Sequence, residues 1–402
     1  MRNSAVSDEN PLKPFVDDII ASDGHTLSGQ LRTLRESLFP PSSQKALRKF
    51  TSGESAKLIG VTDGYLRQLS LAGEGPSPEI GAGGRRLYTL GQINDLRAEL
   101  DKARPAKGFV RHRRDKEHLQ ILAVTNFKGG SGKTTTAAHL AQYLALHGYR
   151  VLAVDLDPQA SLTALHGLQP EFDVGPNATI YGAIRYDGES RELSDIIRPT
   201  YFAGVDLVPG NLELMEFEHD TPRALVDKRE GPLFFGRIAR VLGTVQASYD
   251  IVVLDCPPQL GFLTLGALCA ATGLIVTVHP QMLDVMSMCQ FLLMTSDLLK
   301  VVREAGGSLD YDFIRYLVTR YEPSDGPQTK ITGFMRSLFQ DRVLTHTMVK
   351  STAIADAGLS KQTLYEMGRE FFTRSTYDRA VEALDAVNGE IEGLIRQAWG
   401  RS

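Results

Sequence analysis

Residues 126–136 read NFKGGSGKTTT. An apolar run from Ile121 to Val124 precedes them, and a helix-forming run from Thr134 to His147 follows and stops at Gly148. Glycines let successive backbone N–H groups converge on phosphate oxygens, and the N-terminus of a helix adds positive potential there. The order of strand, glycine-rich loop and helix therefore predicts a phosphate-binding loop that holds a nucleotide.

Two lysines lie in this loop. Lys133 stands where a phosphate-loop lysine reaches the β- and γ-phosphates, and the Thr134 hydroxyl next to it is a ligand for Mg²⁺. The usual pattern has glycine where this chain has Phe127, and Lys128 is an additional feature. Either the two lysines crowd one phosphate cluster, or one of them points across an interface at a nucleotide held by a second copy. The sequence leaves both arrangements open.

Acidic residues end two further apolar runs. Residues 151–154 lead into Asp155 and Asp157, and residues 251–254 lead into Asp255. Buried parallel strands are apolar throughout, and their C-terminal ends face the ligand. A single acid at a strand end is more often a helix cap or a solvated turn residue, but two beside one phosphate loop indicate a site. Asp157 is placed to orient an attacking water, and Asp255 to hold Mg²⁺ through water.

These motifs resemble those of the ParA/MinD-type ATPases. Lys128 to Thr135 resembles their deviant Walker A motif, Asp155 to Gln159 their A′ motif, and Ile251 to Pro258 their Walker B motif. The resemblance covers roughly residues 118 to 400. It implies that the nucleotide is bound by the loop residues Lys128, Gly129, Gly130, Ser131, Gly132, Lys133, Thr134 and Thr135.

The resemblance also implies roles for single residues. Lys128 is the signature lysine that reaches the nucleotide of the partner subunit, and Lys133 and Thr134 bind phosphate and Mg²⁺. The implied catalytic residues are Lys128, Lys133 and Asp157, and the implied metal residues are Thr134, Asp155 and Asp255. ATP and Mg²⁺ are the implied cofactors. The family forms a homodimer around two ATP molecules, binds non-specific DNA in that form, and responds to a centromere-binding partner of the ParB/RepB type.

Composition narrows the class of protein. The chain has 402 residues and a formal net charge of -4, which argues against a uniformly basic coat, so DNA binding must use local patches. Cys256, Cys269 and Cys289 lie in apolar sequence without CxxC spacing, which suits reduced core thiols. Residues 1–14 are polar, and we find no apolar run of membrane-spanning length. We therefore expect a cytoplasmic, nucleoid-associated protein without a membrane partner.

Residues 1–44 are predicted to be a polar tail and a helix from His25 to Pro40. A narrow apolar stripe runs along that helix, formed by Leu27, Leu31, Leu34 and Leu38. The stripe packs within its own domain, or it forms a dimerisation arm, because so narrow a stripe resembles a coiled-coil seam.

Residues 45–104 are predicted to form a winged helix-turn-helix domain. Thr51 to Leu69 has a turn at Gly60 between two helical runs, and a glycine-rich turn at residues 81–84 precedes a helix from Leu90 to Leu100. The pattern resembles MerR-like regulators, and a plain helical hairpin is the alternative. The resemblance places three residues at the bases, Tyr65, Arg67 and Gln68, and two at the DNA backbone, Arg85 and Arg86.

The remaining chain is predicted to be a basic linker, residues 105–117, and an ATPase domain, residues 118–402. Asp101 to Glu117 holds seven basic and three acidic residues, a net charge of +4, which is either a solvated face or a phosphate contact. Apolar strand-like runs then alternate with helical ones, which predicts an α/β fold with a doubly wound, mostly parallel sheet. Thr319 and Arg320 are expected to flank the adenine. The resemblance to the ParA/MinD-type family implies a DNA contact for Lys350, and an ordinary surface lysine is the alternative.

Together these features predict a partition ATPase of the long ParA class, whose N-terminal domain also represses its own operon. Two other interpretations stay open. The protein is a transcriptional regulator whose ATPase fold only senses nucleotide, or it is a metabolic ATPase of the same fold, although the sequence shows no substrate-domain signature.

Overall fold

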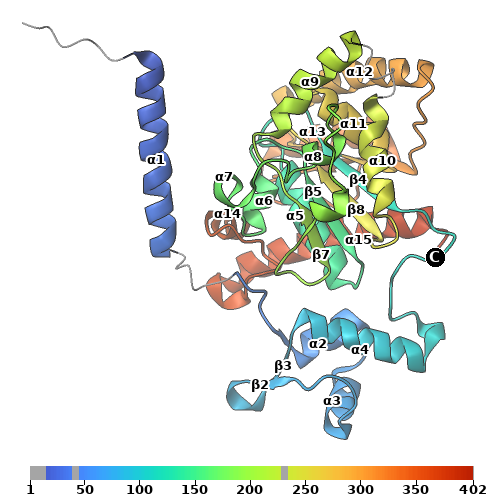
Figure 1. The fold of residues 1–402 in the computed structure, drawn as a ribbon. Coiled ribbons are helices and arrows are strands. Elements are labelled where there is room, and N and C mark those ends of the chain that lie inside the picture. Colours follow the sequence, from blue (N-terminus) through green and yellow to red (C-terminus); the bar gives the residue numbers. More distant parts are fainter. Residues whose placement is uncertain (1–14, 39–44, 228–233, 402) are drawn as a thin grey trace, which may run out of the picture. The chain divides into compact units, whose positions relative to one another are not determined.

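The computed structural model describes residues 15–38, 45–227 and 234–401 of the chain (Figure 1). Residues 1–46 and residues 47–402 are separate units. In the first unit, α1 (Val16–Leu38) begins well before the predicted start at His25, and Asp17 and Asp18 suit its positive N-terminal end. Leu27 is 62% exposed. The other leucines of the predicted stripe lie outside the described side chains: Leu31, Leu34 and Leu38. The dimerisation arm stays a prediction.

The second unit opens with a small module of helices and short strands. The turn at Gly60 and the helix that starts at Leu90 fall where the sequence places them. Its elements are β1 (Phe50–Thr51), α2 (Ser52–Ile59), α3 (Asp63–Ala72), β2 (Glu79–Ile80), β3 (Arg86–Tyr88) and α4 (Leu90–Ala103). Thr51 and Glu54 form a capping box at the start of α2, and Gly60 ends that helix with φ +86°. Thr62 caps α3 by accepting the Tyr65 N–H. The winged helix-turn-helix assignment of this module stays a prediction.

A seven-stranded sheet carries the rest of the unit, with strand order β10-β9-β4-β8-β5-β7-β6. Every pairing is parallel except that of β6 with β7. The strands are β4 (Gln120–Thr125), β5 (Val151–Asp155), β6 (Arg198–Pro199), β7 (Val205–Val208), β8 (Ile251–Asp255), β9 (Gly273–Val278) and β10 (Phe313–Val318). The predicted α/β fold with a mostly parallel sheet is therefore confirmed.

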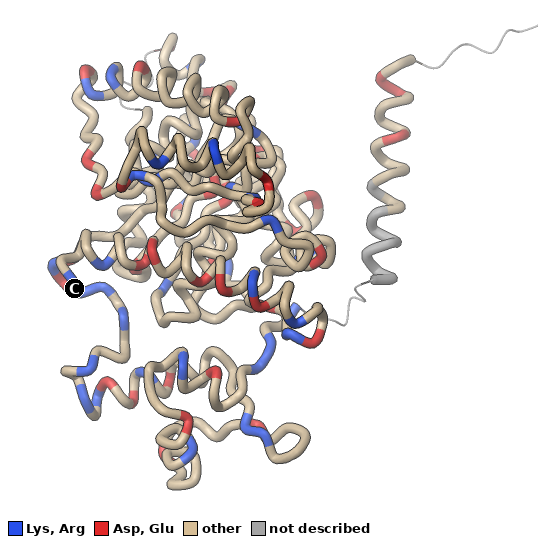
Figure 2. Tube along the Cα trace, turned by 180° about the vertical axis from the view of Figure 1, so that it is seen from behind, with Lys and Arg blue, Asp and Glu red and all other residues tan. Residues whose placement is uncertain are grey.

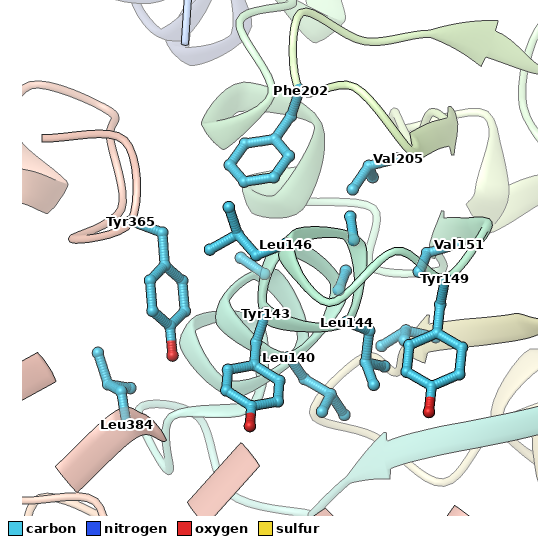
Figure 3. Close-up of a cluster of buried hydrophobic side chains, with 14 of the residues drawn as sticks. Leu140, Tyr143, Leu144, Leu146, Tyr149, Val151, Phe202, Val205, Tyr365 and Leu384 are labelled. Atoms are coloured by element: carbon cyan, nitrogen blue, oxygen red, sulfur yellow. The ribbon is translucent and has the colours of Figure 1, made fainter. Parts of the chain in front are cut away.

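Helices cover both faces of this sheet. They are α5 (Lys133–Leu146), α6 (Ser161–Leu165), α7 (Pro170–Asp173), α8 (Tyr181–Ile184), α9 (Leu214–Val226), α10 (Arg237–Thr244), α11 (Phe262–Ala270), α12 (Met282–Glu304), α13 (Gly326–Phe339), α14 (Thr352–Leu359) and α15 (Arg374–Ala398). Alternate residues of β4 enter opposite cores: Leu122 joins the side of α5 and α15, and Ala123 joins that of α11 and α12. Figure 3 shows Leu140 and Tyr143 of α5 near Tyr365 and Leu384 on the first side.

One buried arginine ties the N-terminal module to the phosphate-loop helix. Arg97 of α4 is 2% exposed, and it donates hydrogen bonds to the carbonyl oxygens of Leu58 at 2.8 Å and Leu146 at 2.5 Å. Burial lowers the pKa of Arg97 to about 10, so the guanidinium stays charged at neutral pH. A cation at the C-terminal carbonyls of α2 and α5 is favourable because the helix dipole is negative there. The end of α5 remote from the phosphate loop is thus anchored to α4 and α2.

The predicted basic linker does not behave as one solvated run. Arg111 pairs with Glu392 of α15, and Arg113 donates to the Gln246 carbonyl oxygen at 2.6 Å. Glu117 pairs with Arg401, near the end of the chain. These arginines bond groups of the ATPase domain, so a DNA phosphate would have to displace those contacts. Figure 2 shows basic and acidic residues interspersed along the trace, in keeping with the net charge.

Helix α12 corrects two expectations. It is 23 residues long with a mean hydropathy of 1.4 over its most apolar window, so by length and composition alone it could span a membrane. The expectation that no run reaches that length is therefore wrong. Met288 and Phe291 pack in the core against the sheet, whereas Met282, Leu283 and Met286 are exposed.

The three cysteines differ in burial. Cys289 of α12 is exposed and Cys269 is half-buried, so Cys256 alone among the three fits the expected buried thiol.

Candidate nucleotide site

The phosphate loop joins β4 to α5 and is held from two neighbouring strands. Gly130 and Gly132 have φ of +75° and +88°, a left-handed backbone that other residues rarely adopt. The Thr319 hydroxyl, after β10, donates to the Ser131 carbonyl oxygen at 2.7 Å. The Ser131 and Thr277 hydroxyls lie 2.9 Å apart, which joins the loop to β9. The loop is therefore fixed to the C-terminal edge of the sheet, as predicted for a nucleotide site.

The two lysines of the loop have different partners. Lys133 is 6% exposed, and its ammonium donates to the Lys128 carbonyl oxygen at 3.1 Å. Burial lowers the pKa of Lys133, and the charges of Asp255 and Asp157 partly offset this. The Lys128 ammonium instead pairs with Asp284 in the first turn of α12. The two ammonium groups therefore do not crowd one position in this structure.

Two buried aspartates face each other at the ends of neighbouring strands. Asp155 and Asp255 are direct partners in the parallel pairing of β5 with β8, and both side chains are fully buried. Asp155 accepts hydrogen bonds from the Thr163 N–H at 2.7 Å and from its hydroxyl at 2.6 Å. Burial raises the pKa of Asp155 to about 7, and burial and the charge of Asp155 raise that of Asp255 well above its usual range.

These residues fit a bound divalent cation. Among the described residues, neither carboxylate oxygen of Asp255 has a hydrogen-bond partner, although unpaired buried polar atoms are rare in proteins. Lys133 and the Thr134 hydroxyl lie close enough to lower the pKa of Asp255. Over the same residues, no cluster of three or more His, Cys, Asp or Glu side chains suits a metal ion. Magnesium would therefore draw its remaining ligands from water and phosphate, its usual preference.

Asp157 lies beside this pair and is 9% exposed. Its Oδ1 atom accepts the Gln159 N–H at 3.0 Å, which orients the carboxylate. The predicted residues Lys133, Thr134, Asp155, Asp157 and Asp255 are thus assembled at one end of the sheet. Their roles in binding and hydrolysis stay predictions.

Sequence reasoning missed several residues of this region. Thr163 has no motif of its own, but both its N–H and its hydroxyl bond Asp155. A cavity of about 240 Å³ lies against the loop, lined by Lys128, Gly129, Gly130, His279, Gln281, Asp284 and Arg320. Arg320, predicted at the adenine, donates to the Gly130 carbonyl oxygen at 3.2 Å and has φ of +52°, a strained value for a long side chain.

The predicted DNA contacts differ in exposure. Arg67, Gln68 and Arg85 are exposed. Tyr65 is half-buried beneath the Arg104 guanidinium, 5.3 Å from the ring centre, and Arg86 donates to the Ser70 hydroxyl at 3.3 Å. In the ATPase domain, the Lys350 ammonium lies 2.8 Å from a carboxylate oxygen of Glu322, so a DNA phosphate would have to displace that pair.

Comparison with known proteins agrees with this geometry. The profile of an AAA domain matches residues 119–305. A protein named "Putative replication protein A" from Rhizobium rhizogenes is 57% identical over 377 residues, which are 93% of this chain and 93% of that protein. The chromosome partitioning protein ParA of Myxococcus xanthus is 30% identical over 237 residues, 59% of this chain and 77% of that protein.

Solved structures share the fold. A structure titled "Partition Protein" matches with a TM-score of 0.65 at 18% identity, covering 93% of this chain and 98% of that one. Cobyrinic acid a,c-diamide synthase from Mycobacterium smegmatis, solved with ADP and magnesium, matches at 28% identity with a TM-score of 0.50. That match covers 60% of this chain and 94% of the synthase. From its phosphate loop, its paired strand-end aspartates and its similarity to these proteins, the chain belongs to the ParA-type partition ATPases of repABC plasmids.

Proposed function

We propose that the protein hydrolyses ATP to ADP and phosphate in a Mg²⁺-dependent reaction and uses the cycle as a switch for plasmid segregation. The observation that carries this proposal is the glycine-rich loop in which the ammonium groups of buried Lys133 and half-exposed Lys128 have different partners. Lys133 neutralises charge on the β- and γ-phosphates of its own nucleotide, and the loop N–H groups hold the phosphate oxygens. Asp157 orients the attacking water with its carboxylate.

Magnesium would be held by Thr134 and, through water, by Asp155 and Asp255, and when bound it would neutralise phosphate charge. Thr163 keeps Asp155 in place during this reaction because it fixes one carboxylate oxygen with two hydrogen bonds. Lys128 reaches the nucleotide of a second copy, so the homodimer closes around two ATP molecules. Closure aligns basic residues of both subunits, Lys350 among them, into a surface for non-specific DNA.

Segregation follows if a centromere-bound partner of the ParB/RepB type accelerates hydrolysis and thereby releases the dimer from DNA. The protein would then be associated with the nucleoid in its ATP form. Its N-terminal module, a winged helix-turn-helix in this proposal, represses the operon by placing α3 in the major groove. The support for that role is that Arg67 and Gln68 are exposed on α3. Thr62 caps this helix, and buried Leu66 anchors it in the module.

The alternative is a nucleotide-sensing repressor with little transport. Comparing operator DNA with random DNA tests the N-terminal module and the ATPase domain separately. Replacing Arg67 and Gln68 with alanine is expected to weaken binding to DNA upstream of its own gene by at least tenfold, because each base contact contributes about 1–3 kcal/mol of discrimination. Binding of the ATP form to random DNA should change less than about threefold, since that binding uses phosphates. Competition titration of both DNAs measures this, and Lys57→Ala, an exposed change on α2, is the matched control.

Equal losses on both DNAs would assign α3 to general phosphate binding and remove the repressor role from the proposal. If the protein ignores random DNA in every nucleotide state but binds its operator, the repressor alternative is correct.

A further inference from the structure

The signature lysine is already engaged within its own subunit. Its ammonium pairs with Asp284, and the other carboxylate oxygen of Asp284 lies 3.2 Å from Nδ1 of His279. Asp284 is 5% exposed, whereas the Lys128 side chain is 42% exposed. Both residues line the cavity described above, the lysine with a half-exposed side chain and the aspartate buried.

Asp284 has a fixed place at the start of α12. It lies in the first turn of the 23-residue helix α12, where the helix dipole is positive, and its N–H donates to the Gln281 carbonyl oxygen at 3.0 Å. Gln281 in turn donates to the His279 carbonyl oxygen at 2.8 Å, so the loop that leaves β9 presents the carboxylate rigidly. A fixed anion that faces a flexible lysine is a defined resting place for that lysine.

We propose that Asp284 is a positioning residue that retains Lys128 on its own subunit until a second copy presents a γ-phosphate. This inference rests on the proposed cross-subunit role of Lys128. A terminal phosphate carries more charge than a carboxylate and displaces Asp284, whereas ADP presents no γ-phosphate and leaves the pair intact. Asp284 thereby makes dimer closure selective for ATP over ADP, at the expense of weaker closure in ATP.

The resting pair is measured directly by competitive acylation of lysines in the nucleotide-free protein. Lys128 is expected to be labelled more slowly than Lys330, an exposed lysine on α13, because its ammonium is paired. In Asp284→Asn the labelling of Lys128 should rise at least twofold while that of Lys330 stays constant. Asp297→Asn, which removes an exposed acid from the same helix, is the charge-matched control.

The consequence for closure is measured by sedimentation in ATP and in ADP. A half-exposed ion pair is worth at most about 1 kcal/mol, and each dimer displaces two of them, so Asp284→Asn should lower the protein concentration at half-maximal dimerisation in ATP about tenfold to twenty-fivefold. It should also allow some dimer in ADP. Asp284→Glu, which keeps the charge, should restore the preference for ATP, and Asp284→Ser serves as a second neutral variant if the asparagine variant does not fold.

The outcomes separate this inference from the function on which it rests. Unchanged labelling of Lys128 in the folded neutral variant, or a dimer that is no stronger in ATP, overturns the role of Asp284. If Lys128→Ala dimerises in ATP like the wild type, the cross-subunit role of Lys128 itself is wrong, whatever the acylation shows.

Discussion

ATP hydrolysis by Lys133→Ala is expected to fall by about two to three orders of magnitude, the usual loss when a preorganised group that stabilises transition-state charge is removed. Lys133 is buried beside Asp255 and Asp157, and its ammonium donates to the Lys128 carbonyl oxygen. A nucleotide would replace that carbonyl with phosphate oxygens. Phosphate release in Mg²⁺ and ATP measures the change, and fluorescent-nucleotide titration measures binding.

Lys330→Ala is the control for this change, since Lys330 is exposed and lies on α13 rather than on the loop. The control should retain wild-type hydrolysis. Hydrolysis by Lys133→Ala within about threefold of the wild type would show that the loop between β4 and α5 is not the phosphate site.

Lys128→Ala is expected to abolish ATP-dependent dimerisation while the monomer still binds ATP within about threefold of the wild-type affinity. The reason is that the Lys128 ammonium pairs with Asp284, whereas it is the Lys133 ammonium that lies against the loop backbone, where the proposal places the phosphates of the same subunit. A cation supplied across an interface to a phosphoryl group contributes about 10³–10⁵ in rate, so partner-stimulated hydrolysis should be lost as well. Sedimentation in ATP and a binding titration measure the two effects separately.

A variant that loses ATP binding and dimerisation together would place Lys128 at its own subunit's nucleotide. The arrangement in which both lysines serve one phosphate cluster would then replace the cross-subunit role.

The sequence predicts the parts of this site that have a local motif, in the phosphate loop and at the ends of the buried strands. Glycines 130 and 132 and the acids at the ends of β5 and β8 have strict local requirements, so their spacing along the chain is enough to identify them. Parallel strands also bring their C-terminal ends to one edge, which makes the meeting of Asp155 and Asp255 predictable.

Contacts between distant segments could not be predicted in this way. Asp284 is an ordinary acid on an apolar helix until β9 is placed beside β4, which brings it to Lys128. The arginines after residue 104 look like a solvated basic run, and only the fold shows that Arg111 pairs with Glu392. Whether Cys289 is exposed likewise depends on which face of α12 packs against the sheet.

The nucleotide switch is tested most directly by binding to random-sequence duplex DNA in ATP, in ADP and without nucleotide, each across a salt series. The account predicts tight binding in ATP that weakens sharply in ADP. The logarithm of the affinity should fall with the logarithm of salt concentration, with a slope of about −0.9 for each phosphate contact, because only the closed dimer presents enough of them. Equal affinity in ATP and ADP, or no binding in either, would contradict the central claim that ATP closes a DNA-binding dimer.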